Sequence, residues 1–338
     1  MASITINGVF FTYPDDPCLI FNPCIIRVGY NVARVQIYIN GYRVTYAASS
    51  GECVVDISEY LQSSFTSLRL GSNIVNGKSE LGKTVNITVI ALASDNTALA
   101  QLNRAIFCVW GGTASGETYD SPHKLIMHQS YPFTLGYYFG AATDLDIYFE
   151  GVDGTQSLLG TYSIESQGVW NIPIYPLATG MVYVSQHGNP SLVYARVKVL
   201  EHRDGIYLRW VDRFGFWRYW LFKAGDPTRT AASLYGIWNR IDWDDYDNGT
   251  WKSDAGRRQS FTRNDIQPIC APLVSQDVFD VLQDLTTSPA IEMMMETDPT
   301  EKWQPVTVEA GQYTKDIKKP EQDFICNLVL PEIPVQSL

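Results

Sequence analysis

The sequence predicts a mainly β protein, built from two to three antiparallel β-sandwich-like modules with one or two short helices. Short segments in which apolar and polar residues alternate recur about every ten residues, and Gly, Asn or Pro separates them. The chain has 338 residues, of which 45% are hydrophobic and 13% aromatic. This composition suffices for packed cores and excludes a disordered chain. The length predicts two or three modules of ordinary size.

The first expected module covers residues 1–112. Its segment ARVQIYINGYRVTYAA carries Asn40-Gly41, the preferred pair for a two-residue type I′ turn. A hairpin about this turn leaves Tyr38 on one face. It brings three apolar pairs together on the other face: Ile39 with Tyr42, Ile37 with Val44, and Val35 with Tyr46. Further along, the pattern predicts a short helix over 56–61 and strands over 85–92 and 104–110.

The second expected module covers residues 113–203, after a glycine-rich loop at 111–116. Its glycine spacing fits neither dinucleotide-binding nor Walker loops. Strands are expected over 143–151, 168–176 and 192–200. The first of these alternates strictly. It is expected to face the core with Leu145, Ile147 and Phe149, and to face outward with Asp144, Asp146, Tyr148 and Glu150.

The third expected module covers residues 204–338 and opens with an aromatic hairpin at 205–225. Two aromatic runs flank the loop Asp212-Arg213-Phe214-Gly215, and both faces carry bulky side chains. Residues 224–263 are expected to form a long polar excursion. A helix is predicted at about 275–287, capped by Ser275, and strands are predicted over 303–308 and 324–330.

Three interpretations of the aromatic hairpin stay open. Its rings fill the core of the third module, or anchor a partner subunit as Trp, Tyr and Arg often do, or stack on sugars. Core packing is favoured first and a subunit interface second. The interface candidates are Arg209, Trp210, Arg213, Trp217, Tyr219 and Trp220 in the hairpin, and Tyr38, Asn40 and Gly41 in the first module.

Composition and spacing argue against several classes of function. The formal net charge is −11, and such a surface repels nucleic acid. The N-terminal segment lacks the pattern of a signal peptide, and no apolar run reaches the ~20 residues of a membrane helix. We therefore expect assembly in a cytoplasm without membrane insertion. The six cysteines show no Cys-x-x-Cys pair, so buried free thiols are expected.

No catalytic or cofactor motif stands out. His123 and His128 are five residues apart, which on a strand places them on opposite faces. The cluster Asp242, Asp244, Asp245 and Asp247 lacks the glycine and glutamate positions of an EF-hand loop, although a calcium site there stays open. The outward acidic stripe at 144–150 is typical of an antiparallel sheet as well as of a glycosidase cleft. We expect no enzyme, no cofactor and no metal.

The order of several short motifs resembles the distal-tail and baseplate structural proteins of tailed phages that infect Bacteroidetes. The motifs are Val109-Trp110-Gly111-Gly112, then Leu208-Arg209-Trp210 with Gly215-x-Trp217-x-x-Trp220-Leu221-Phe222, then Ser288-Pro289, Trp303-x-Pro305-Val306, Lys318-Lys319 and Leu330-Pro331. The resemblance implies a mostly β, non-enzymatic virion protein that forms a ring, commonly a hexamer.

This resemblance implies that the chain connects tail tube, hub and host-recognition proteins in the virion tail, after assembly in the bacterial cytoplasm. Its partners are then further copies of itself and other tail proteins. The alternative is a carbohydrate- or receptor-binding module that uses exposed aromatic side chains.

Overall fold

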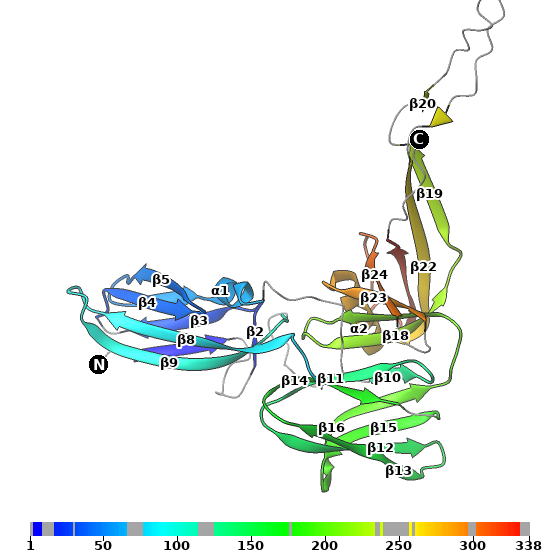
Figure 1. The fold of residues 1–338 in the computed structure, drawn as a ribbon, viewed down its shortest axis with the longest axis horizontal. Coiled ribbons are helices and arrows are strands. Elements are labelled where there is room, and N and C mark those ends of the chain that lie inside the picture. The colour runs from blue at the N-terminus through cyan, green and yellow to red at the C-terminus, as the bar shows by residue number, and fades with distance from the viewer. Residues whose placement is uncertain are drawn as a thin grey trace, which may run out of the picture. The chain divides into compact units, whose positions relative to one another are not determined.

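In a computed structural model, the chain forms two compact units (Figure 1). The described residues are 3–8, 17–29, 31–65, 77–113, 125–175, 178–233, 237–238, 257–258, 261–296 and 302–331. The first unit contains Met1–Arg203, Arg209–Trp220 and Thr287–Ala290; the second contains Asp204–Leu208, Leu221–Thr286 and Ile291–Leu338. Strands dominate both, which confirms the mainly β prediction. Within the described ranges, no helix is long and apolar enough to cross a membrane.

The N-terminal part of the first unit folds as two sheets. One has the strand order β1-β3-β6, with β1 (Ser3–Gly8), β3 (Cys24–Gly29) and β6 (Cys53–Asp56). The other has the order β2-β9-β8-β4-β5, with β2 (Cys18–Leu19), β4 (Arg34–Ile39), β5 (Tyr42–Ala47), β8 (Gly82–Leu92) and β9 (Ala98–Val109). Helix α1 (Ser58–Ser63) begins two residues after the start of the helix predicted over 56–61. The pair β2 and β9 is parallel, a departure from the antiparallel prediction.

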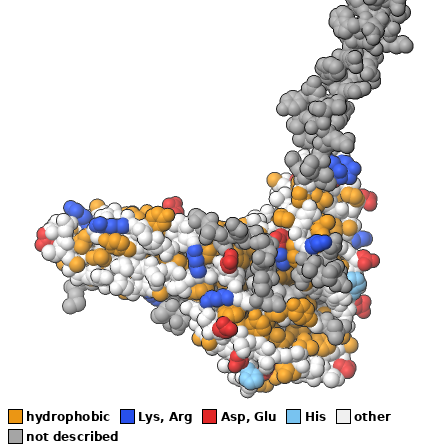
Figure 2. All heavy atoms as spheres, viewed as in Figure 1, with side chains coloured by type: hydrophobic (Ala, Val, Ile, Leu, Met, Phe, Trp, Pro, Cys, Tyr) orange, Lys and Arg blue, Asp and Glu red, His pale blue; other side chains and the backbone are white. Residues whose placement is uncertain are grey.

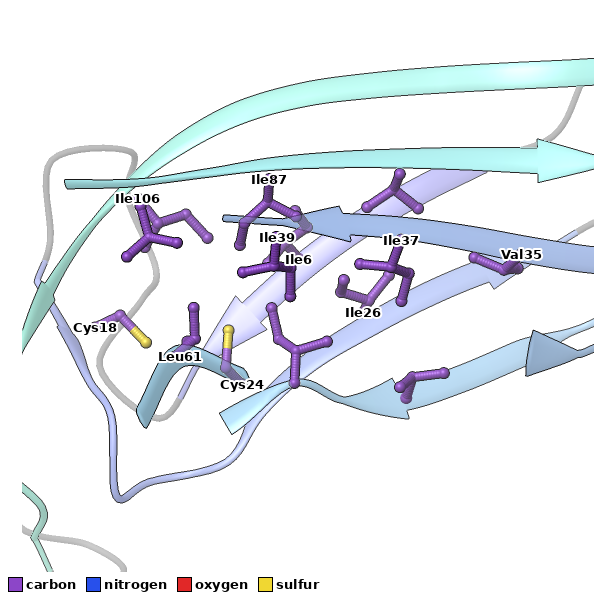
Figure 3. Close-up of a cluster of buried hydrophobic side chains, with 14 of the residues drawn as sticks. Ile6, Cys18, Cys24, Ile26, Val35, Ile37, Ile39, Leu61, Ile87 and Ile106 are labelled. Atoms are coloured by element: carbon purple, nitrogen blue, oxygen red, sulfur yellow. The ribbon is translucent and has the colours of Figure 1, made fainter. Parts of the chain in front are cut away.

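A single apolar core joins these two sheets (Figure 3). Ile6 and Ile26 come from the three-stranded sheet, Ile37 and Ile87 from the five-stranded sheet, and Leu61 from α1. All five side chains are buried. The period-two alternation of the sequence therefore places one face of each sheet in this core.

Cysteines take part in the same core. All six cysteines of the chain are free, and all but Cys270 are buried. A hydrogen bond to Cys108 raises the pKa of the Cys18 thiol above its usual range. A hydrogen bond to Cys18, and then burial, raise the pKa of Cys24. These thiols stay protonated at neutral pH and behave as small apolar side chains.

The Asn40-Gly41 hairpin forms as predicted. Its register places Ile39 opposite Tyr42, with the two further predicted pairs following along the strands. Asn40 and Gly41 have φ angles of 46° and 85°, as a type I′ turn requires. Within the first pair, Ile39 is buried, but Tyr42 is 60% exposed. The reason is that β5 is the edge strand of its sheet.

The second module also contains two sheets. The larger has the order β10-β16-β15-β12-β13, with β10 (Leu125–His128), β12 (Thr143–Gly151), β13 (Gln156–Ile164), β15 (Gly180–Gln186) and β16 (Asn189–Leu200). The smaller has the order β11-β14-β7, with β7 (Gly77–Lys78), β11 (Phe133–Phe139) and β14 (Gly168–Ile174). Strand β7 comes from the first 112 residues and pairs Lys78 with Trp170, so the two predicted modules share a sheet.

The C-terminal strands form one sheet with the order β18-β17-β23-β24-β25-β22-β19, and an additional pairing of β18 with β22 closes it on itself. Its strands are β17 (Ile206–Val211), β18 (Trp217–Ala224), β19 (Thr228–Ser233), β22 (Phe261–Ser275), β23 (Ile291–Glu296), β24 (Lys302–Val308) and β25 (Glu321–Val329). The short strands β20 (Ile237–Trp238) and β21 (Arg257–Arg258) pair with each other. The hairpin of β17 and β18 contributes to both compact units.

The predicted C-terminal helix is α2 (Gln276–Gln283), continued by a 3₁₀ turn (Asp284–Thr287). Phe279 is buried and lies edge-on to Phe324, with ring centroids 5.4 Å apart. Ser275 occupies the N-cap position but makes no side-chain capping bond. It is also the last residue of β22, paired with Glu321. The capping role predicted for this side chain is therefore wrong.

The described part of 224–263 corrects another prediction. Strand β19 pairs with the start of β22, Thr228 lying opposite Ile266. This stretch was expected to be an irregular excursion. Its sequence, TRTAAS, has no apolar alternation. β19 is an edge strand, and the side chains from Thr228 to Ala231 are all exposed.

Candidate functional site: the aromatic hairpin and its docking segment

Asp212 shapes the turn of the aromatic hairpin. Its Oδ1 accepts hydrogen bonds from the backbone N–H of Phe214 (2.9 Å) and of Phe216 (2.8 Å). Its backbone N–H donates to the carbonyl of Phe216 (2.8 Å), and its carbonyl accepts from Gly215 (3.0 Å). Gly215 has a φ angle of 77°, which glycine adopts without strain. One aspartate thus satisfies most of the backbone polar groups of this loop.

The second carboxylate oxygen of Asp212 forms an ion pair with Arg218. The distance between Oδ2 and Nη2 is 2.6 Å, and both side chains are almost fully buried. The guanidinium also lies over the ring of Phe216, 5.5 Å from its centroid. Two charges removed from water depend on each other, because either alone carries an uncompensated desolvation cost. The pair therefore fixes how the hairpin closes.

The tip of the hairpin packs against the segment Val109-Trp110-Gly111-Gly112. The N–H of Gly112 donates to the carbonyl of Arg213 at 2.6 Å. A Cβ at Gly111 would lie 2.6 Å from that carbonyl oxygen, and a Cβ at Gly215 would lie 2.5 Å from the carbonyl oxygen of Trp110. Both backbones therefore approach so closely that only glycine fits.

Apolar side chains surround this contact. They form one buried cluster that draws on β2, β9, β14 and the hairpin: Leu19, Phe107, Val109, Val169 and Phe216, with Tyr138 and Phe214 packed against it. The hydroxyl of Tyr219 lies 2.6 Å from Oγ1 of Thr134 in β11. The hairpin tip is thus packed against other segments of the first unit.

The hairpin residues predicted as interface candidates mostly lie inside the chain. Arg209, Trp210, Trp217 and Tyr219 are 5%, 0%, 4% and 5% exposed. Their burial within one chain favours the core interpretation over the interface and sugar-stacking interpretations. Bulky side chains on both faces did require partners, but the partners belong to the same chain.

The other candidates are accessible. Arg213 is exposed at the hairpin tip, and Trp220 is half-buried, with its ring 6.0 Å from that of His128. In the first module, Asn40 and Gly41 are exposed, and Tyr38 is half-buried with its hydroxyl 3.2 Å from Oε1 of Gln36. The interface role of these residues stays a prediction.

Sequence reasoning missed a histidine–carboxylate pair. Nδ1 of His187, in the turn between β15 and β16, lies 2.8 Å from Oδ1 of Asp146 in β12. Asp146 was expected to face solvent, but this turn covers it and leaves it 5% exposed. Its Oδ2 also accepts from the N–H of Gly188 (3.3 Å). No local pattern signals the pair, because 41 residues separate its members.

This pair makes a testable prediction of pH dependence. The hydrogen bond to Asp146 raises the pKa of His187, and the same bond lowers the pKa of Asp146. The stabilisation from His187 is therefore complete below the unfolded pKa of about 6.5 and is lost as pH rises through the raised pKa. An NMR titration should place His187 above 6.5, and Asp146→Asn should return it towards that value. An unchanged His187 pKa in the variant would contradict the pairing.

Among the residues that the structure describes, no three His, Cys, Asp or Glu side chains come together as a metal site. His128 is buried in β10, and burial, with Arg203 nearby, lowers its pKa to about 4. His123 and the Asp242–Asp247 cluster lie outside the described residues. In the acidic stripe of β12, Glu150 accepts a hydrogen bond from Gln156 (2.7 Å).

The glycine-rich loop shows no phosphate cradle in its described part. The N–H of Gly112 is bonded to Arg213, and the N–H of Thr113 donates to Oδ1 of Asn22 at 2.8 Å. The side-chain amide of Asn22 in turn donates to the Thr113 carbonyl at 2.9 Å. Backbone groups that a phosphate needs are therefore already used within the chain.

Comparisons with known proteins add little. No family model matches the chain, and no curated protein matches it. A solved structure from Porphyromonas gingivalis W83, described as a protein of unknown function, is similar to 59% of this chain and 99% of its own length. The sequence identity is 9% and the TM-score 0.17, which is too low to support any inference.

Proposed function

We propose that the chain is a non-enzymatic structural protein of a tailed-phage virion. It forms a ring at the distal tail or baseplate and connects tail tube, hub and host-recognition proteins. The proposal rests on the order of motifs that resembles such proteins. One structural observation supports it most: two of these motifs, Gly111-Gly112 and the hairpin tip, contact each other through the bond from Gly112 to Arg213. The two motifs therefore lie in contact within the first unit.

A ring needs a heterologous interface that closes. The edge strand β5 is a suitable element, because no other described strand pairs with its outer edge. Unpaired edge strands accept strands from partners. The exposed turn Asn40-Gly41 and the exposed ring of Tyr42 lie at the end of this edge. We assign the ring contact to this edge.

Light scattering of the purified protein tests the proposal. The expected mass is that of a hexamer rather than the 38.0 kDa of one chain. Tyr42→Lys should lower this mass, because it places a charge in the contact. Tyr175→Lys, at a side chain that is 63% exposed, serves as the matched control and should leave the mass unchanged. A strict monomer that electron microscopy never finds in tail particles would contradict the proposal.

Binding of a carbohydrate or receptor is the alternative function. Trp217 in the hairpin cannot supply its platform, since its side chain is 4% exposed. The observation that favours it lies elsewhere, on the outer face of the five-stranded sheet of the second module.

A further inference from the structure

A row of large side chains crosses the outer face of the β10-β16-β15-β12-β13 sheet. The strand register places Leu158 opposite Tyr148, Tyr148 opposite Tyr183, and Tyr183 opposite Arg196. Residues adjacent to this row along the strands are buried in the core: Ile147, Val182, Val184, Ala195 and Val197. Since side chains alternate between the faces of a strand, the row points away from the core.

A second row continues the same face. Glu150 lies opposite Met181, and Met181 lies opposite Lys198. Neighbouring strands are about 4.8 Å apart, so the four adjacent strands β13, β12, β15 and β16 span about 14 Å. Figure 2 shows hydrophobic side chains exposed among charged ones on the visible side of the molecule. On the outer face of this sheet, the two rows place leucine, tyrosine and methionine beside charged residues, so the face is partly apolar.

Charge is divided across this face. The carboxylate of Glu150, which is half-buried, lies on β12, whereas the exposed cations of Arg196 and Lys198 lie on β16. A long polyanion meets repulsion at β12, and a polycation meets repulsion at β16. A neutral ligand that both donates and accepts hydrogen bonds, and has an apolar surface of its own, fits both sides.

We propose that this face binds a neutral saccharide. The C–H face of a pyranose ring packs against the side chains of Tyr148 and Tyr183, which are half-buried and belong to residues that lie opposite each other on adjacent strands. Hydroxyls at the ring edge donate to Glu150 and accept from Arg196 and Lys198. A few placed polar groups around an apolar surface are what fix the orientation of a small ligand. The proposal goes beyond ring assembly and does not depend on it.

Contacts within the chain hold these side chains in place before any ligand arrives. Glu150 is bonded to Gln156 at 2.7 Å, and Asp146 to the ring of His187 at 2.8 Å. The guanidinium of Arg196 lies 5.7 Å from the ring centroid of Tyr183. Side chains already ordered lose less conformational entropy on binding.

The test uses the purified full-length chain on an array of neutral oligosaccharides, followed by calorimetric titration with the strongest binder. Tyr183→Ala is expected to weaken binding about tenfold, because it removes half of the stacking surface. Arg196→Gln should also weaken binding, and its exposed position keeps the fold intact. Tyr175→Ala, an exposed tyrosine outside this face, should bind as the wild type does.

Three outcomes would overturn the proposal: binding to no neutral oligosaccharide, binding to anionic glycans alone, or binding that Tyr183→Ala and Arg196→Gln both leave unchanged. The oligomeric mass is measured on the same samples. Sugar binding by a strict monomer would count against the ring and in favour of this site, so the two proposals fail separately.

Discussion

Replacing Asp212 with alanine is expected to lower the free energy of unfolding of the first unit by about 4 kcal/mol. The substitution leaves the guanidinium of Arg218 buried without its counter-ion, which lies 2.6 Å away in the native chain. It also removes the acceptor for the N–H groups of Phe214 and Phe216. Urea unfolding followed by tryptophan fluorescence measures the loss.

Two variants separate the contributions. Asp212→Asn keeps an acceptor for the loop amides but removes the charge, so its cost isolates the ion pair. Asp153→Ala is the matched control, since Asp153 caps an exposed turn through the N–H of Thr155 (3.0 Å) and has no buried cation. It should cost about 1 kcal/mol. Equal losses for Asp212→Ala and Asp153→Ala would mean that the ion pair contributes nothing.

Local patterns predicted most of the regular structure. The Asn40-Gly41 turn determined a register that the structure reproduces, because the turn type and the apolar alternation specify the same pairing. The strand at 143–151 was predicted with its observed bounds for the same reason. Strands without alternation were missed, and β19, with the sequence TRTAAS, is the clearest case.

The candidate site was harder to predict than the fold. The sequence of the aromatic hairpin predicted that both of its faces pack against other residues. A sequence does not say whether those residues belong to the same chain or to another. The contact between Gly112 and Arg213 joins segments that are about a hundred residues apart in the chain. The sequence of neither segment alone therefore predicts the contact. The pair of His187 and Asp146 was missed for the same reason. Contacts between side chains of strands that are distant in sequence can be predicted only once the register of those strands is known.

The close approach at the hairpin tip leads to the second large effect. Gly215→Ala is expected to destabilise the first unit by about 3 kcal/mol, from two causes. The φ angle of 77° is strained for alanine, and the new Cβ would lie 2.5 Å from the carbonyl oxygen of Trp110. Relieving that overlap separates the hairpin tip from the segment at 109–112. Urea unfolding measures the loss of stability.

Gly41→Ala provides the matched control. Gly41 has a φ angle of 85°, but nothing lies within 4 Å of the Cβ that alanine would add. Its substitution therefore costs only the backbone strain, about 1 kcal/mol. The difference between the two variants measures how strongly the hairpin tip is held against Trp110. If the two variants lose equal stability, the hairpin tip is not tightly packed against Trp110.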